Sequence, residues 1–464
     1  MEPFILSMFK NRIRKKEKLF YLNTNSIFDI ASGSYLPGIS NTKTFHKGQH
    51  YLNGGLAPLN GIIGTEQTFK SSIGLSFLSR VLKLYKDSCG LCYDSEFAIP
   101  NEERIINMSD DMNYGHKIED RLILKDKSDY DMDGFFNLLK EIAFEREKHM
   151  EELLVETPFV NLKTNESYLT PIPFIIIIDS FSLMQSYKEL DMVIAHDLSA
   201  KEQNMIPMMD GKSKSQFVRQ LPLLAHKGGL HIILTAHITT KVQINPFERS
   251  KKDLQFMKTN DTTRGTGKQF RALLNILLET RTVKSLQDSK KESQYPDGSS
   301  SNVELSEINS IICRNKNNES GTTVPLISSQ KNGIQASLGY YHYLINNPNK
   351  GFGMDHGIRS SKLLLKPNVT LSRHSVRKIL KEDYEITRAV EILGQLCYLK
   401  NWWNISNSPE LEKLSTMEIK DICEKLVNNK SIPIKDILNT RGYWTYDKKD
   451  KRSYMSVIDI LSLI

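Results

Sequence analysis

The segment at residues 64–71 constrains this chain most, because it lies between an apolar run and a helical pattern. Residues 59–63 predict a strand, and residues 72–78 predict the helix that follows. A turn between a strand and a helix presents backbone N–H groups and a helix N-terminus to an anion. Lys70 adds a full positive charge, and the Ser71 hydroxyl can ligate magnesium. We therefore expect a nucleoside triphosphate, ATP with Mg²⁺, to bind at Gly64, Thr65, Glu66, Gln67, Thr68, Phe69, Lys70, Ser71 and Ser72.

This motif departs from the common pattern at one position. The pattern has glycine immediately before the lysine, and here Phe69 occupies that place. Short motifs also recur by chance, so the alternative is an ordinary surface helix that begins with a Lys-Ser pair. Evidence from other segments of the chain is therefore needed to distinguish a phosphate-binding site from an ordinary surface helix.

A second segment carries an acid at the end of a strongly apolar run. Residues 174–178 include four consecutive isoleucines, and Asp179 follows them. Such a run predicts a strand buried on both faces of a parallel sheet, where ligands gather at the carboxyl ends of strands. Asp179 is therefore expected to hold magnesium opposite Ser71, and the alternative is a helix N-cap, which does not exclude the first role.

A third segment, residues 90–97, predicts another short strand that ends in acids. A carboxylate beside a phosphate site can orient or deprotonate the water that attacks the terminal phosphorus. Glu96 is the candidate for that catalytic role, at the tip of a strand expected beside the phosphate-binding turn. The alternative is a solvated turn residue.

Taken together, these motifs resemble the UvsX recombinases of tailed phages, which are relatives of bacterial RecA. The resemblance rests on Thr68-Phe69-Lys70-Ser71, on residues 93–97, on Asp179-Ser180 and on the run 232–237, and the family also has phenylalanine before the lysine. It covers about residues 45–340. It implies a RecA-like P-loop ATPase core, α/β with a central mostly parallel sheet flanked by helices. It also implies catalytic roles for Lys70, Glu96, His237 as the γ-phosphate sensor, and Arg314 and Lys316 offered to the ATP of a neighbouring subunit.

Two segments suit DNA-facing loops. Residues 198–215 are basic and rich in methionine, and residues 239–268 are long, have little periodicity and include Phe247 and Phe256. Basic side chains track phosphates, and an aromatic ring can insert between bases, so this composition favours single-stranded DNA held without sequence readout. A solvated surface loop is the alternative. The expected DNA-binding residues are Lys212, Lys214, Lys241, Arg249, Lys251, Lys252, Arg264 and Lys268.

The remaining segments suggest how the chain is organised. We expect a basic N-terminal segment at residues 1–45 for oligomerisation or DNA contact, the ATPase core at 46–360, and a helical C-terminal domain at 361–464. Residues 101–168 look like an insert with one amphipathic helix at 135–144, and residues 287–302 look like a hairpin extension. The tryptophans at 402, 403 and 444 are expected to anchor a small C-terminal core.

Composition agrees with an intracellular nucleotide enzyme. The chain has 464 residues, a formal charge of +8 and a pI of about 8.9, which favour an anionic partner. Five scattered cysteines give no disulfide framework, and no apolar run approaches a membrane span, so a cytoplasmic location is expected, inside the host cell if a phage encodes the chain. Cys92 is expected to be a buried thiol rather than a zinc ligand.

These expectations combine into one functional hypothesis. A DNA-dependent ATPase would polymerise on single-stranded DNA as a helical filament, pair it with double-stranded DNA and promote strand exchange in recombination, repair and recombination-dependent replication. Mediator and single-strand-binding proteins are further candidate partners, and no membrane is involved. The sequence around residues 314–323 also resembles the basic finger of DnaB-type hexameric helicases, and this is the alternative. A DNA-binding filament or mediator with weak ATPase activity is the third.

Overall fold

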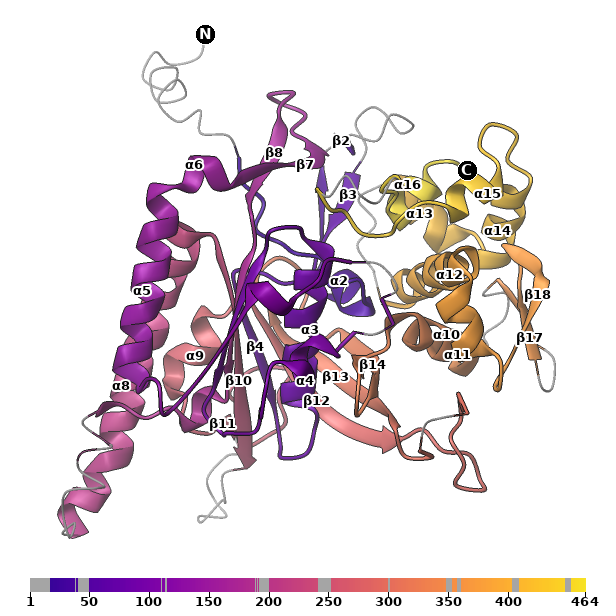
Figure 1. Cartoon of the computed structure of the whole chain (residues 1–464). Coiled ribbons are helices and arrows are strands. Elements are labelled where there is room, and N and C mark those ends of the chain that lie inside the picture. Colours follow the sequence, from indigo (N-terminus) through magenta and orange to yellow (C-terminus); the bar gives the residue numbers. More distant parts are fainter. Residues whose placement is uncertain are drawn as a thin grey trace.

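A large, mostly parallel sheet lies at the centre of the molecule (Figure 1). The structure is a computed structural model, and it describes residues 17–37, 39–40, 50–109, 111–112, 115–187, 189, 191, 200–240, 252–298, 301–347, 353–356, 360–402, 409–446 and 452–464. Within them, the parallel strands follow the spatial order β12 (Ile276–Ser285), β4 (Leu59–Gly64), β10 (Leu230–Thr240), β9 (Phe174–Asp179), β5 (Cys89–Asp94) and β6 (Leu122–Asp126).

Antiparallel strands extend this sheet. Beyond β12 lie β13 (Leu305–Asn315), β14 (Thr323–Ser329) and β15 (Gly333–Ile334), and β11 (Asp261–Thr263) pairs with the end of β10. Residues 287–302 join β12 to β13, so the predicted hairpin extension is confirmed. The expected mixed α/β architecture with a mostly parallel central sheet is likewise present.

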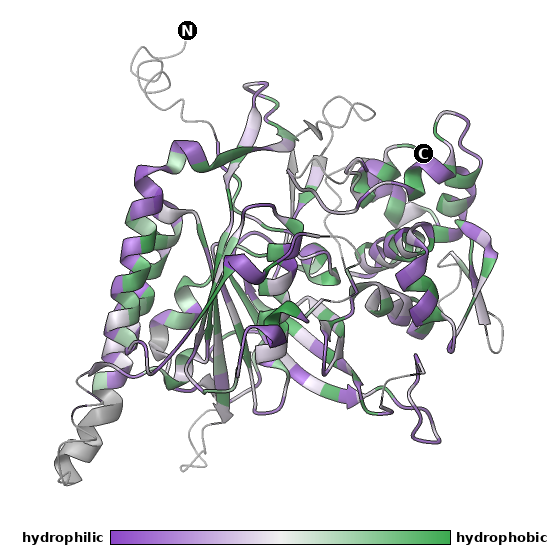
Figure 2. Cartoon of the chain, in the orientation of Figure 1, coloured by the Kyte–Doolittle hydropathy of each residue, from purple (hydrophilic) through white to green (hydrophobic). Residues whose placement is uncertain are grey.

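The isoleucine run shows why the sheet is buried on both faces. Successive side chains of a strand point to opposite faces. Ile175 and Ile177 belong to one hydrophobic core, Ile176 and Ile178 belong to the other, and all four are fully buried. Figure 2 shows hydrophobic residues predominating along the central strands. The predicted buried strand is therefore confirmed.

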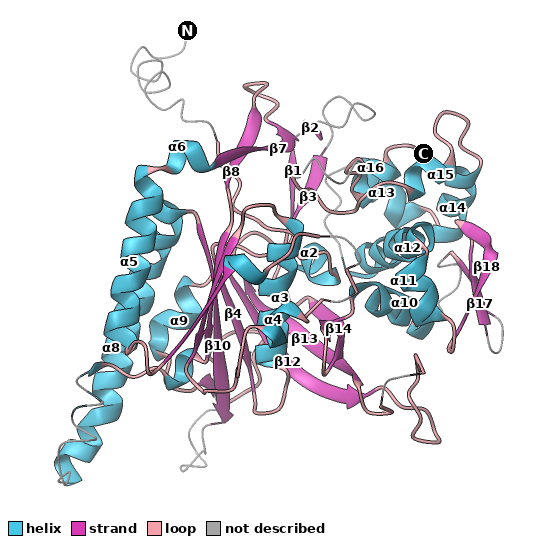
Figure 3. Cartoon of the chain, in the orientation of Figure 1, coloured by secondary structure: helices cyan, strands magenta, loops and turns pink. Residues whose placement is uncertain are grey.

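Helices cover the two faces of the sheet (Figure 3). The first core contains residues of α2 (Ile27–Ser32), α3 (Lys70–Leu84), α10 (Ala336–Asn346) and α12 (Tyr384–Trp402). The second contains residues of α5 (Met132–Lys148), α8 (Ala200–Gly228) and α9 (Gly267–Leu273). The predicted amphipathic helix is confirmed as part of α5, because Phe135 and Leu139 are buried in the second core.

The shorter elements surround this frame. The shorter elements that come before β9 in the sequence are β1 (Ser34–Pro37), β2 (Ile39–Ser40), β3 (His50–Asn53), α4 (Glu103–Ile106), α6 (Met150–Leu153), β7 (Leu154–Val160) and β8 (Ser167–Pro171). On the C-terminal side they are β16 (Met354–His356), β17 (Ser360–Leu363), β18 (Lys366–Ser372), α11 (Val376–Glu382), α13 (Pro409–Thr416), α14 (Ile419–Val427), α15 (Ile434–Leu438) and α16 (Val457–Leu461). The C-terminal part is mostly helical, as predicted, although a small three-stranded sheet precedes its helices.

The structure corrects three expectations about elements. Residues 101–168 are not simply an insert, because they supply β6, a parallel strand of the central sheet. Residues 200–215 belong to helix α8 rather than to a loop. Further along, α8 packs along α5 and buries Phe217 and Leu221. β5 is not next to β4, because β10 and β9 lie between them.

The ends of the chain also pack differently from the expectation. Leu22 and Phe28 are buried in the first core, so this part of the N-terminal segment belongs to the body of the protein. Trp444 is buried against Tyr85, which follows α3, and Phe159 of β7, whereas Trp402 is 39% exposed. The tryptophans therefore do not form one C-terminal core, and Trp403 lies outside the described residues.

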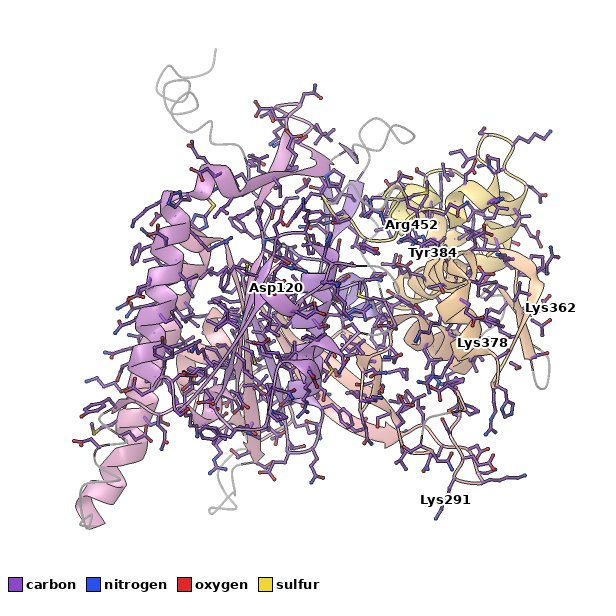
Figure 4. All side chains as sticks on the ribbon, viewed as in Figure 1. Asp120, Lys291, Lys362, Lys378, Tyr384 and Arg452 are labelled. Atoms are coloured by element: carbon purple, nitrogen blue, oxygen red, sulfur yellow. The ribbon has the colours of Figure 1, made fainter. Side chains whose placement is uncertain are left out.

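A stacking contact ties the last described segment to the C-terminal helices. The Arg452 guanidinium lies 3.7 Å from the ring centroid of Tyr384, at the start of α12 (Figure 4). Such a cation–π contact contributes about 0.5–1 kcal/mol at an exposed site. Among the described helices, none combines the length and apolar character needed to cross a bilayer.

Candidate functional site

The turn between β4 and α3 is held in place by β12. Gly64 ends β4, and a Cβ there would lie 2.0 Å from Thr280 Oγ1, so a side chain does not fit. The Thr280 hydroxyl donates to Thr68 Oγ1 at 2.7 Å, and the Thr68 hydroxyl donates to the Thr65 carbonyl at 2.7 Å. The turn is therefore fixed by side chains more than 200 residues apart in the sequence, and neither threonine pair was predicted.

Phe69 shows why glycine is common before the lysine of such turns. Its φ is +64° and its ψ is +20°, in the left-handed region that side chains disfavour. α3 begins at the next residue, Lys70. The first N–H groups of a helix have no intrahelical acceptors, so Ser71 and Ser72 lie where an anion can be bound.

A cavity of about 780 Å³ lies in front of this turn, at the carboxyl ends of the parallel strands. Register places His237 of β10 beside Gly64, and Asp179 of β9 beside Asp94 of β5. The structure thus brings together residues predicted from separate segments. The cavity is lined by Glu66, Gln67, Thr68, Phe69, Lys70, Ser71, Ser72, Glu96, Asp179, Leu183, His237, Arg264 and Gln330.

Asp179 lies at the bottom of the cavity and is 2% exposed. Its Oδ1 accepts hydrogen bonds from Ser71 Oγ at 3.0 Å and from Thr235 Oγ1 at 2.5 Å. Burial raises the pKa of this carboxyl, and the two hydroxyls act in the opposite direction. Asp179 does not cap the short helix that follows, where Ser180 holds the N-cap position without a side-chain bond. Thr235 was missed, and its only signal was a polar residue inside an apolar strand.

Lys70 is 6% exposed, and its ammonium group donates to the Thr65 carbonyl at 2.5 Å. Burial lowers the pKa of Lys70, and the carboxylates of Asp179, Glu96 and Glu66 act in the opposite direction. A buried cation surrounded by oxygen atoms is suited to an anionic ligand that would replace the carbonyl contact.

Glu96 reaches the cavity through the loop after β5. Asp94 holds this loop, since its carboxylate accepts from the backbone N–H groups of Glu96 at 2.9 Å and Ile99 at 2.6 Å. Glu96 Oε1 lies 3.2 Å from Nε2 of His237. That hydrogen bond lowers the pKa of Glu96, so the carboxylate is ionised at neutral pH.

The predicted DNA-binding residues fall into different environments. Lys212 and Lys252 are exposed, but Lys214 is buried, with its ammonium donating to the Ser182 carbonyl and pairing with Asp210 at 2.9 Å. Arg264 lines the cavity. Phe256, expected to face DNA, packs on Gly321 and the second core. The side chain of Lys268 and all of Lys241, Arg249 and Lys251 lie outside the described residues.

Arg314 and Lys316 lie far from the cavity of their own chain. β13 runs antiparallel to β12, and Arg314 pairs with Leu277 near the start of β12. The cavity is at the other end of these strands, because Leu277 pairs with Gly61 of β4, three residues or about 10 Å before Gly64. Arg314 Nε donates to the Leu274 carbonyl, before the start of β12. Lys316 Nζ donates to the Leu273 carbonyl at 2.7 Å. Neither side chain can therefore serve this cavity within one chain.

Comparisons with known proteins add no relative. No family model matches the chain, and no curated protein matches it either. The chemistry of the site therefore rests on its own residues.

Proposed function

We propose that the cavity binds the triphosphate of ATP with Mg²⁺ and that the protein hydrolyses it. One observation carries this proposal: Lys70 and Ser71 open α3 after the turn that follows a buried strand, with the Asp179 carboxylate 3.0 Å from the Ser71 hydroxyl. A lysine, a hydroxyl and a carboxylate in this order suit a phosphate-binding turn of the P-loop type. The cavity of about 780 Å³ falls within the size range of small-molecule sites.

The oxygen donors at the bottom of the cavity suit magnesium. Mg²⁺ prefers hydroxyl, carboxylate and phosphate oxygens, and Ser71 and Asp179 would hold it directly or through water. When bound, the ion neutralises charge that develops on the phosphates. Lys70 would exchange its carbonyl contact for phosphate oxygens, and the backbone N–H groups at the start of α3 would bind others.

Glu96 is the residue that can activate water. The hydrogen bond that it accepts from His237 lowers its pKa further below neutral, and it lines the same cavity as Lys70. A carboxylate there can orient a water molecule and accept its proton as the water attacks the terminal phosphorus. His237 in turn holds the Glu96 carboxylate in place.

The wider proposal is a recombinase that polymerises on single-stranded DNA and exchanges strands between homologous molecules. The formal charge of +8, the exposed Lys212 and Lys252, and the helix α8 that extends beyond the sheet support an anionic polymer as partner (Figure 1). Arg314 and Lys316 would serve a neighbour's cavity, which makes hydrolysis depend on assembly. The hexameric helicase shares all of these features and remains the alternative.

The nucleotide site is tested by titrating the protein with ATP and Mg²⁺ in a calorimeter. Lys70→Ala should weaken binding at least about tenfold, because a charge-assisted hydrogen bond contributes about 1.5–3 kcal/mol. Lys86→Ala removes the same charge from an exposed site beyond α3 and should leave affinity unchanged. Equal affinities for the wild type and Lys70→Ala would refute the assignment.

Assembly separates the recombinase from the helicase. Electron microscopy with ATP and single-stranded DNA should show helical filaments for a recombinase and closed six-membered rings for a helicase. A strand-exchange assay between homologous single- and double-stranded DNA then tests the activity directly. Rings without strand exchange would contradict the recombinase proposal.

A further inference from the structure

Arg264 is an exposed cation on the wall of the triphosphate cavity. It follows β11 directly and lines the same cavity as Lys70 and Ser71 at the start of α3. Of the carboxylates that line the cavity, Glu96 bonds His237, and Asp179 bonds Ser71 and Thr235. Within the described part of the chain, no acidic side chain forms an ion pair with Arg264. Its guanidinium is thus available to an anion in the same space as Lys70.

The backbone of Arg264 is held by the residues that surround His237. The Arg264 N–H donates to the His237 carbonyl at 2.8 Å, and the Arg264 carbonyl accepts from Ser182 Oγ at 3.0 Å. The same Ser182 oxygen accepts from the His237 N–H at 3.0 Å. Gly265 follows with φ +59°, a conformation that turns the chain sharply after Arg264. A side chain on so fixed a backbone is suited to a defined ligand position.

From this geometry we infer that Arg264 binds the terminal phosphate of the nucleotide held by its own chain, and not DNA. The inference rests on the proposed ATP site. Guanidinium groups bind phosphate in a bidentate manner. Arg264 adjoins His237, whose partner Glu96 is proposed to activate the water that attacks the terminal phosphorus, so the Arg264 guanidinium would contact the phosphate farthest from the sugar. ADP lacks that phosphate, so Arg264 distinguishes ATP from ADP.

The contacts behind Arg264 connect this phosphate contact to α8. Lys214 of α8 donates to the Ser182 carbonyl at 2.8 Å, and it pairs with Asp210 one turn earlier. Ser182 thus joins Arg264, His237 and α8 through adjacent hydrogen bonds. Arg264 also sits at the base of the β10–β11 pair, which brackets residues 241–260. A phosphate bound by Arg264 would therefore be connected to both segments proposed to face DNA, to α8 through Ser182 and to residues 241–260 through β11.

The test compares ATPγS with ADP in binding titrations of the full chain. Arg264→Ala should weaken ATPγS binding about tenfold or more and leave ADP binding within about twofold, because the charged contact reaches only the third phosphate. Arg264→Lys should recover part of the loss. Arg219→Ala removes an exposed arginine of α8 outside the cavity and should change neither affinity.

Binding to an oligothymidine without nucleotide gives the second measurement. The salt dependence of that binding should be the same for wild type and Arg264→Ala. In Arg264→Ala, the slope of the logarithm of the DNA-binding constant against the logarithm of the salt concentration could instead fall by about one, with an unchanged ratio of ATPγS to ADP affinity. That result would identify Arg264 as a DNA contact and overturn the inference. Unchanged ratios alone would overturn it while leaving the ATP site intact. A wild type that binds neither nucleotide would overturn the ATP site and the inference together.

Discussion

Phe69 occupies a backbone position that side chains disfavour. Its φ of +64° places it in the left-handed region, and its ring packs partly against the first core. A residue without Cβ relieves the backbone, while loss of the ring removes apolar contact. The phenylalanine thus combines a strained backbone with a packing contribution at the position that precedes Lys70.

Two single substitutions of Phe69, one by glycine and one by alanine, separate these effects. Phe69→Gly and Phe69→Ala both remove the ring, so their difference reports the backbone alone. We expect Phe69→Gly to be more stable than Phe69→Ala by about 1 kcal/mol, because alanine retains the Cβ that left-handed geometry disfavours. Urea unfolding measures the difference. Equal stabilities would mean that the turn changes its conformation when the ring is lost.

At the scale of an element, helix α16 depends on a buried carboxylate at its N-terminus. Asp459 is 1% exposed, and its Oδ2 accepts from the Ser456 N–H and the Ser456 hydroxyl, both at 2.8 Å. The Asp459 N–H donates back to Ser456 Oγ, which completes a reciprocal cap. Burial raises the pKa of Asp459 to about 6, and the Ser456 contacts oppose this shift.

This shift predicts a pH dependence of stability. Between about pH 4 and pH 6 the folded state keeps a proton that the unfolded state releases, so the free energy of unfolding falls as pH rises. Asp459→Asn cannot titrate. Its free energy of unfolding, relative to that of the wild type, should rise by up to about 3 kcal/mol between pH 4 and pH 6.5, at about 1.4 kcal/mol per pKa unit. Urea midpoints across this range measure the gain, and parallel profiles would contradict the assignment.

At the scale of the whole molecule, the C-terminal helices share one core with the sheet. Leu393 of α12, Leu78 of α3 and Phe28 of α2 belong to the same cluster of buried residues. Arg377 of α11 pairs with Glu304 at 2.9 Å and with Asp297 at 3.1 Å, which fastens the β12–β13 extension to the C-terminal side. These contacts predict that residues 361–464 unfold together with the rest of the protein.

Trp444 tests this shared core. Its ring lies 5.3 Å from Tyr85 and 6.1 Å from Phe159, between centroids, and its backbone N–H donates to Asn23 Oδ1 at 3.2 Å. Trp444→Ala should lower the free energy of unfolding by about 3–5 kcal/mol, and Trp444→Phe should lower it less because phenylalanine retains a ring. Calorimetry should show one transition that moves to lower temperature. Two transitions, of which only one moves, would indicate an independent C-terminal domain.

The local sequence determined the elements that carry the site. An apolar run followed by turn and helix residues defined β4 and α3, four isoleucines defined β9, and the acid-ended run defined β5. Because the carboxyl ends of parallel strands meet at one edge, Lys70, Ser71, Asp179 and Glu96 could be expected together, and they line one cavity. These features depend on patterns within a few residues of each other.

Only the tertiary structure decided which distant residues complete the site. Thr235 bonds Asp179, Thr280 holds the turn at Thr68, and Arg264 faces the cavity. Lys214 resembles any solvent-exposed lysine in the sequence, yet α8 packing buries it beside Asp210. Such placements depend on strand order and helix packing between segments tens to hundreds of residues apart, and a local pattern of residues carries no information about them.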